Sequence, residues 1–101
     1  MAQFDVYPNP NPETADIFPY FVDIQHPLHS SLDARVVIPL TTDPIPFSRL
    51  TPQIEIEGRQ VILSPADISS IPASLCQHPV TNLEAHRNQI IDAIDFLIQG
   101  F

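Results

Sequence analysis

The carboxyl-terminal stretch of this chain, from Thr81 to Phe101, constrains the fold most, because it is a long amphipathic helical pattern. Thr81 and Glu84 have the spacing of a capping box, which predicts that the helix begins there. At 100° per residue, one arc of about 120° collects the apolar positions. These positions are Leu83, Ile90, Ile91, Ile94, Leu97, Ile98 and Phe101. We expect this arc to face a core.

The opposite side of the same helix is polar and acidic. It carries Glu84, Asn88, Asp92, Asp95 and Gln99, with Phe96 beside them. Asp92 and Asp95 lie towards the negative end of the helix dipole, which favours basic residues, so helix stability does not explain them. Two interpretations stay open. This side is either a solvated face with one aromatic ring packed under a loop, or a contact surface for a partner.

Five short segments have the residue pattern of strands: Gln3–Tyr7, Tyr20–Gln25, Arg35–Leu40, Gln53–Glu57 and Gln60–Leu63. The first should have one buried face. The third is a β-branched run typical of a central strand, and we expect Pro39 to end its pairing. Strict alternation in the fourth, followed by Gly58, predicts a hairpin with the fifth.

The connecting segments are rich in proline, with 12 Pro and only 2 Gly in the chain. Pro8 to Pro12 removes backbone donors at alternating positions and should form an extended surface loop. A second proline-rich segment runs from Thr41 to Pro52. The pattern from Ser64 to Pro79 predicts irregular or partly helical packing.

The order of these elements predicts one domain over residues 1–101, of the α+β class, with mainly antiparallel strands curled into a partial barrel. The terminal helix should close one end of that barrel. Its apolar arc, together with Phe96 and Phe101, exceeds what one small sheet needs. A two-fold homodimer would cover the excess.

The charge balance bears on the kind of partner. The chain has no Lys and 4 Arg against 12 carboxylates, for a net charge of -8. Direct nucleic-acid binding is not expected, because it depends on several clustered cationic contacts. A basic protein surface is the better electrostatic match.

We expect a cytoplasmic protein. Cys76 is the single cysteine, so an intramolecular disulfide is impossible and a small core residue is the expected role. We find no stretch long enough to span a membrane and no signal-peptide pattern.

Two catalytic or metal-binding patterns are weak. His26 and His29 lack a third ligand at a recognisable spacing, so no metal is expected. Ser69 and Ser70, near Asp67 and His78, lack the strand–turn–helix context of a hydrolase nucleophile. We expect no catalytic residues and no cofactor.

Several segments together resemble the CcdB family of bacterial toxins. They are Gln3-Phe4-Asp5-Val6-Tyr7, Phe21-Val22-Asp23-Ile24-Gln25, Arg35-Val36-Val37-Ile38-Pro39-Leu40, Ser70-Ile71-Pro72, and a closing helix that ends in Gly100. The resemblance covers nearly the whole chain. It implies an SH3-like barrel with a carboxyl-terminal helix, assembled as a homodimer through the helix end, where the residues are Leu97, Ile98 and Phe101.

The resemblance also implies a function that involves no catalysis. Family members bind DNA gyrase A and trap the complex in which DNA is cleaved. A cognate CcdA-like antitoxin wraps a disordered segment around the toxin and removes it from gyrase.

By position, the implied gyrase-binding residues are Asp95, Gln99, Gly100 and Phe101. Gln99 replaces a Trp of the best-known member, and Asp95 replaces an Asn. Two alternatives remain. One is a non-toxic relative that binds antitoxin. The other is an mRNA endoribonuclease of the MazF/Kid type on the same fold, against which the shortage of cationic side chains argues.

Overall fold

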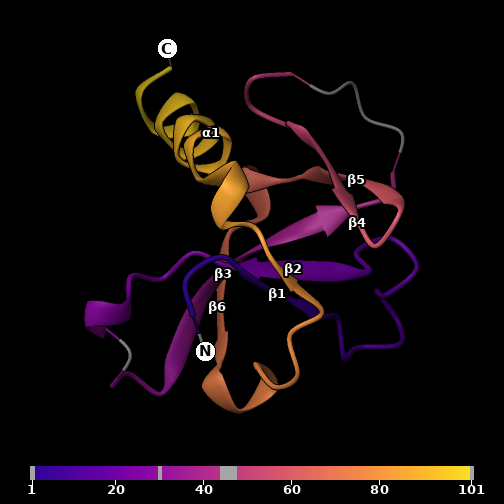
Figure 1. Cartoon of the computed structure of the whole chain (residues 1–101), viewed down its shortest axis with the longest axis vertical. Coiled ribbons are helices and arrows are strands. Elements are labelled where there is room, and N and C mark those ends of the chain that lie inside the picture. Colours follow the sequence, from indigo (N-terminus) through magenta and orange to yellow (C-terminus); the bar gives the residue numbers. More distant parts are fainter. Residues whose placement is uncertain (1, 30, 44–47, 101) are drawn as a thin grey trace.

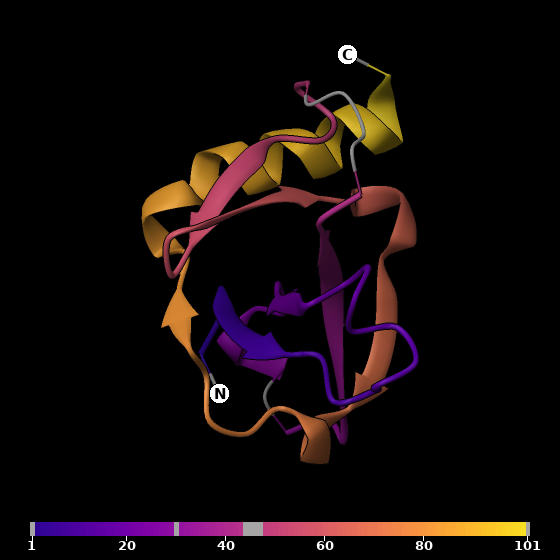
Figure 2. The same cartoon turned by 90° about the vertical axis from the view of Figure 1, so that its right-hand side faces the viewer.

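The computed structural model describes residues 2–29, 31–43 and 48–100. Within these ranges one antiparallel sheet of seven strands curls into a nearly closed barrel, and one α-helix, α1 (Arg87–Gln99), lies across it (Figures 1 and 2). The strands are β1 (Asp5–Pro8), β2 (Tyr20–Asp23), β3 (Ala34–Thr41), β4 (Gln53–Ile56), β5 (Arg59–Leu63), β6 (Ser69–Pro72) and β7 (Thr81–Asn82). The predicted α+β class and barrel with a terminal helix are confirmed.

The long strand β3 makes the barrel curl. One edge pairs with β2, and the other pairs first with β6, through residues 34–37, and then with β5, through Leu40 and Thr41. The prediction that Pro39 ends the pairing is wrong, because Pro39 pairs with Phe21 and the strand continues to Thr41. Pro39 lies where β3 changes neighbour from β6 to β5, and there its carbonyl accepts from the Ser64 N–H at 3.0 Å. The missing proline N–H is therefore tolerated.

The hairpin of β4 and β5 forms as predicted. Ile54 and Ile56 point inward, while Gln53 and Glu55 are exposed. The two connecting residues both have positive φ, 52° at Glu57 and 78° at Gly58. This is the backbone of a type I′ turn, which matches the twist of the two strands. The alternation and the glycine thus identified both the strands and the turn.

The barrel interior holds the main core. Its buried members come from five strands and from the carboxyl-terminal segment: Phe4, Val6, Val22, Ile38, Leu40, Ile54, Ile56, Val61, Leu63, Leu83, Ile90 and Ala93. A second, smaller cluster lies against the other face of the sheet and consists of Tyr7, Phe21, Val37 and Cys76. The expectation of one buried face for the first strand is therefore wrong, since Tyr7 is buried as well as Val6. Cys76 is buried, as expected.

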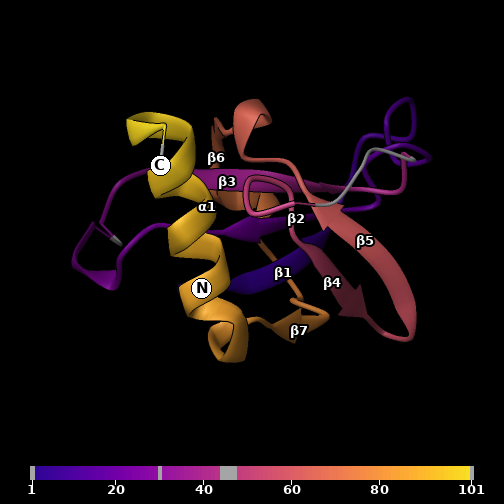
Figure 3. The same ribbon diagram turned by 90° about the horizontal axis from the view of Figure 1, so that it is seen from above.

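Residues 64–86 contain two strands that the sequence did not predict. β6 pairs with β3, and its neighbours are the single-turn helices η2 (Pro65–Asp67) and η3 (Ala73–Leu75). Thr81 belongs to β7 and pairs with Val6, so the predicted capping box is wrong. The chain then makes a 3-10 turn, η4 (Glu84–His86), before α1 begins at Arg87 (Figure 3).

The strand β3 also carries a buried ion pair. The Arg35 Nε donates to Asp23 Oδ2 at 2.9 Å, and both side chains are fully buried. Asp23 Oδ1 accepts the Gln25 N–H at 2.9 Å, so the carboxylate is bound on both oxygens.

In the described part of the chain, none of the helices has the length and apolarity that a membrane crossing requires.

Candidate functional site: the carboxyl-terminal helix and the adjoining loop

The helix α1 is attached to the barrel by a narrow apolar face. Ile90 and Ala93 are fully buried, and Ile94 packs against them from the same side. Ala93 was absent from the predicted arc because a small side chain adds little to a hydrophobic pattern. Its spacing of three residues from Ile90, which places both on one face of the helix, could have identified it. Three members of the predicted arc are exposed instead: Ile91, Leu97 and Ile98.

Three of the four residues implied to bind gyrase lie in the last turns of this helix or directly after it. Asp95, Gln99 and Gly100 are exposed, and Phe101 lies outside the described residues. Gly100 has φ of 79°, and its N–H donates to the Phe96 carbonyl at 2.8 Å. This left-handed cap is a common helix ending that favours glycine. It ends α1 with its last polar side chains in solvent.

Two of the three residues implied to form a dimer interface are apolar and accessible. Leu97 is 39% exposed and Ile98 is 74% exposed, and Phe101, the third of them, is not among the described residues. Ile91 lies on the same flank as Ile98, seven residues or about two helical turns away. The single chain therefore leaves an apolar strip on α1 that its own barrel does not cover.

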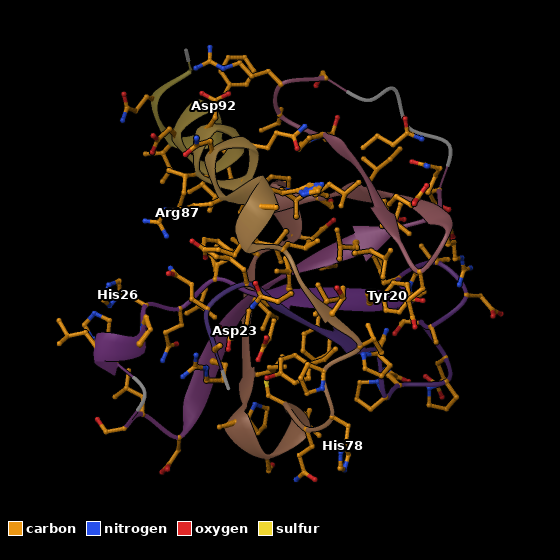
Figure 4. All side chains as sticks on the ribbon, viewed as in Figure 1. Tyr20, Asp23, His26, His78, Arg87 and Asp92 are labelled. Atoms are coloured by element: carbon orange, nitrogen blue, oxygen red, sulfur yellow. The ribbon has the colours of Figure 1, made fainter. Side chains whose placement is uncertain are left out.

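The acidic side of α1 is partly occupied by the chain itself. Arg49, which belongs to the second proline-rich segment just before β4, donates from Nε to Asp92 Oδ2 at 2.8 Å and from Nη2 to Oδ1 at 2.9 Å. Figure 4 shows Asp92 on the outer side of the helix. The unfavourable position of Asp92 in the helix dipole is thus offset by a bidentate cation.

The same guanidinium also covers the aromatic ring. Arg49 Cζ lies 4.9 Å from the centroid of Phe96, within the range of a cation–π contact. Phe96 is half-buried in this arrangement. The interpretation of an aromatic ring packed under a loop residue is therefore confirmed for Phe96. The contact-surface interpretation of the remaining acidic side stays a prediction.

The ion pair shifts the titration of both partners in the expected directions. The hydrogen bonds from Arg49 hold the pKa of the Asp92 carboxyl below its usual value. The pKa of Arg49 is raised, first by its hydrogen bond to Asp92 and then by the charges of Asp92 and Asp95. Asp95 makes no ion pair or hydrogen bond within the described ranges, so this part of α1 retains net negative charge.

A groove of about 290 Å³ lies on the opposite part of the molecule, where the first proline-rich loop meets the outer face of the sheet. Its walls are largely apolar. The loop contributes Asn9, Pro10, Asn11, Thr14 and Phe18. The strands β2 and β3 contribute Tyr20, Phe21, Val37 and Pro39, and β6 and η3 contribute Ser69, Ile71 and Leu75. The sequence marked this loop only as exposed. Because the groove joins segments distant in sequence, no local pattern could reveal it.

The patterns considered for chemistry are not brought together. Asp67 accepts the Ser64 hydroxyl at 2.7 Å, while Ser69 and Ser70 are exposed on β6. Among the described residues, no three His, Cys, Asp or Glu side chains gather as a metal site would require. Two of the four arginines, Arg35 and Arg49, are paired with carboxylates.

The family model described as CcdB protein matches residues 3–100, which is nearly the whole chain. No curated protein matches the sequence.

Proposed function

Because this chain belongs to the CcdB family, we propose that it is the toxin of a type II toxin–antitoxin module that binds DNA gyrase A and traps the cleaved-DNA complex. Family membership supports the toxin role itself. The observation that carries the finer proposal is the free end of α1, where Asp95, Gln99 and Gly100 stand in solvent beyond the barrel. Poisoning of this kind needs contact with gyrase and no reaction by the toxin.

A homodimer is part of the proposal, with Leu97, Ile98 and Phe101 at its interface. Exposed apolar side chains that recur on one flank of a helix are typical of self-association through a two-fold axis. Leu28, in the single-turn helix η1 (Pro27–His29), adds an 80% exposed apolar side chain. Figure 4 places His26, next to η1, on the same side of the molecule as Arg87 of α1. Both apolar segments would therefore be available to one partner face.

A CcdA-like antitoxin is the second partner, and we assign its extended segment to the groove beside the first proline-rich loop. The groove is apolar. Among the segments that line it, the loop between β1 and β2 lies apart from the end of α1 (Figures 1 and 2). A disordered segment that folds on binding suits an apolar groove of this kind. A Leu75→Asp variant should lose antitoxin affinity and keep gyrase affinity, which calorimetry with each partner would measure. Equal antitoxin affinity in this variant and the unaltered protein would exclude the groove.

Expression in bacteria tests the gyrase proposal. We expect growth arrest, rescue by a resistant gyrase A allele, and intact messenger RNA in the arrested cells. Cells that grow normally would support the non-toxic relative, provided that the protein still binds its antitoxin. Cleaved messenger RNA produced by the purified protein would support the endoribonuclease. The matched control is Gln60→Ala, an exposed substitution on β5 that should leave growth arrest unchanged.

A further inference from the structure

Asp92 and Phe96 lie one turn apart on α1 and together hold a single guanidinium group. The carboxylate of Asp92 accepts two parallel hydrogen bonds, at 2.8 and 2.9 Å, and the Phe96 ring centroid lies 4.9 Å from the guanidinium carbon. Proteins recognise arginine with two kinds of group. A carboxylate accepts two parallel hydrogen bonds from the guanidinium, and an aromatic ring stacks on its planar face. Lysine offers a point charge and cannot make both contacts in this geometry.

The occupant of this site is exchangeable. Arg49 comes from a segment outside the helix, and the side chains of Arg49 and Asp92 remain 50% and 46% exposed. Exposed ion pairs contribute little to folding and are screened by salt. The Asp92–Phe96 pair can therefore release Arg49 without disturbing the core, which is held by Ile90 and Ala93 on another face of α1.

The surroundings of the site carry more negative charge than Arg49 neutralises. Asp95 follows on the same exposed side and, within the described ranges, makes no ion pair. The whole chain has a net charge of -8. A basic partner segment would thus meet an excess of carboxylates here, and its arginine would replace Arg49 with equivalent contacts.

We propose that Asp92 and Phe96 form an arginine-binding site for a partner protein, and that Arg49 fills this site in the free protein as an internal competitor. The identity of the partner, gyrase A, rests on the proposed function. The existence of the site does not. The apparent affinity for the partner is proportional to the fraction of molecules in which the site is open, and Arg49 lowers that fraction. Removal of Arg49 should therefore tighten binding.

The first test needs no gyrase. N-acetyl-arginine amide is titrated into isotopically labelled Arg49→Ala protein, and the chemical shifts of Asp92 and Phe96 are followed by NMR. We expect saturable shifts at both residues, weaker shifts in the unaltered protein, and none in the Arg49→Ala/Asp92→Asn double variant. N-acetyl-lysine amide is the matched probe and should give smaller shifts. Equal responses to the two probes, or no response in Arg49→Ala, would overturn the arginine-binding site.

The second test measures gyrase A binding by calorimetry. Arg49→Ala should bind about two- to tenfold more tightly than the unaltered protein, while Asp92→Asn and Phe96→Ala should bind more weakly. Unchanged or weaker binding by Arg49→Ala would refute its role as a competitor. If no variant binds gyrase A at all, the proposed function fails, and the NMR titration alone decides the arginine-binding site. Circular dichroism of each variant verifies that the fold is retained.

Discussion

The Arg35 guanidinium and the Asp23 carboxylate lie in contact within the barrel wall, with Nε 2.9 Å and Nη2 2.7 Å from the same oxygen. Both side chains are fully buried. A buried pair of this kind costs desolvation, and its members depend on each other, because either one alone would be an uncompensated charge. The pair links β2 to β3 at the start of the long strand that curls the sheet.

We therefore predict that Asp23→Ala lowers the free energy of unfolding by about 3–5 kcal/mol, because it leaves the Arg35 charge buried and unpaired. Urea denaturation measures this. The double variant Asp23→Leu/Arg35→Met should lose much less than the sum of the two single substitutions. The exposed control Asp16→Ala should stay within about 0.5 kcal/mol of the original value. Additive losses in the double variant would show that the two groups are not coupled.

The turn between β4 and β5 gives a pair of opposite predictions. Gly58→Ala places a side chain at φ of 78° and should destabilise the protein by about 1 kcal/mol, although nothing lies within 4 Å of the new Cβ. Glu57→Asn, at φ of 52°, should stabilise it by a few tenths of a kcal/mol, because asparagine tolerates positive φ at this position of the turn. Thermal unfolding of both variants tests the turn type. Two substitutions with the same sign of effect would argue against it.

The ion pair between Arg49 and Asp92 predicts an acid-sensitive contact. Since Arg49 holds the pKa of Asp92 below its usual value, the pair is fully formed above about pH 4 and is lost as the pH falls through that lowered pKa. Carbon-detected NMR titration of the Asp92 carboxyl should give a higher pKa in Arg49→Ala than in the unaltered protein. An identical titration in both proteins would mean that the pair does not form in solution.

Tyr7 predicts a change at the alkaline end. Burial, and secondarily the charge of Asp5, raises the pKa of its phenol well above the usual value. The folded state thus keeps the phenol neutral, so its contribution to stability is complete below about pH 10 and declines as the pH rises further. Unfolding free energies measured over the alkaline range around that pH should fall less steeply in Tyr7→Phe. Equal slopes would show that Tyr7 ionises freely in the folded protein.

Local patterns predicted the parts of the fold that local physics determines. The alternation from Gln53 to Glu57 and the glycine after it predicted a hairpin. This local pattern was sufficient because a two-residue turn pairs the strand before it with the strand directly after it. The amphipathic helix and the β-branched run from Arg35 were recognisable for similar reasons. β6 and β7 were not, since their mostly exposed residues are strands only through pairing with distant β3 and β1.

The capping box shows how tertiary context overrides a correct local signal. Thr81 and Glu84 have the right types and spacing, yet Thr81 pairs with Val6, and the Glu84 N–H donates to the Asn82 side chain at 2.8 Å. The backbone of Phe4 is involved as well. Its carbonyl accepts from the Leu83 N–H, and its φ is 71°, which is unusual for a bulky residue. Pairing with β1 delays the helix until Arg87.

The sequence predicted where the candidate site lies on the helix, but it did not predict that Arg49 contacts it. The helix wheel gathered Asp92, Asp95 and Gln99 on one side, which the structure leaves exposed or half-exposed. Arg49 lies 43 residues from Asp92 in sequence, and no periodicity relates the two. A contact between a loop and a helix depends on the complete fold, so a single sequence read by local pattern does not reveal it.

DNA cleavage with purified gyrase decides the role of the helix end. The unaltered protein should accumulate cleaved DNA, and a variant truncated after Gln99 should not, while circular dichroism reports an unchanged fold. Gln99→Trp should increase cleavage, because an aromatic side chain there gains a stacking surface. Cleaved DNA in equal amounts from the unaltered and truncated proteins, or none from the unaltered protein at saturating concentration, would contradict a gyrase poison that acts through the end of α1.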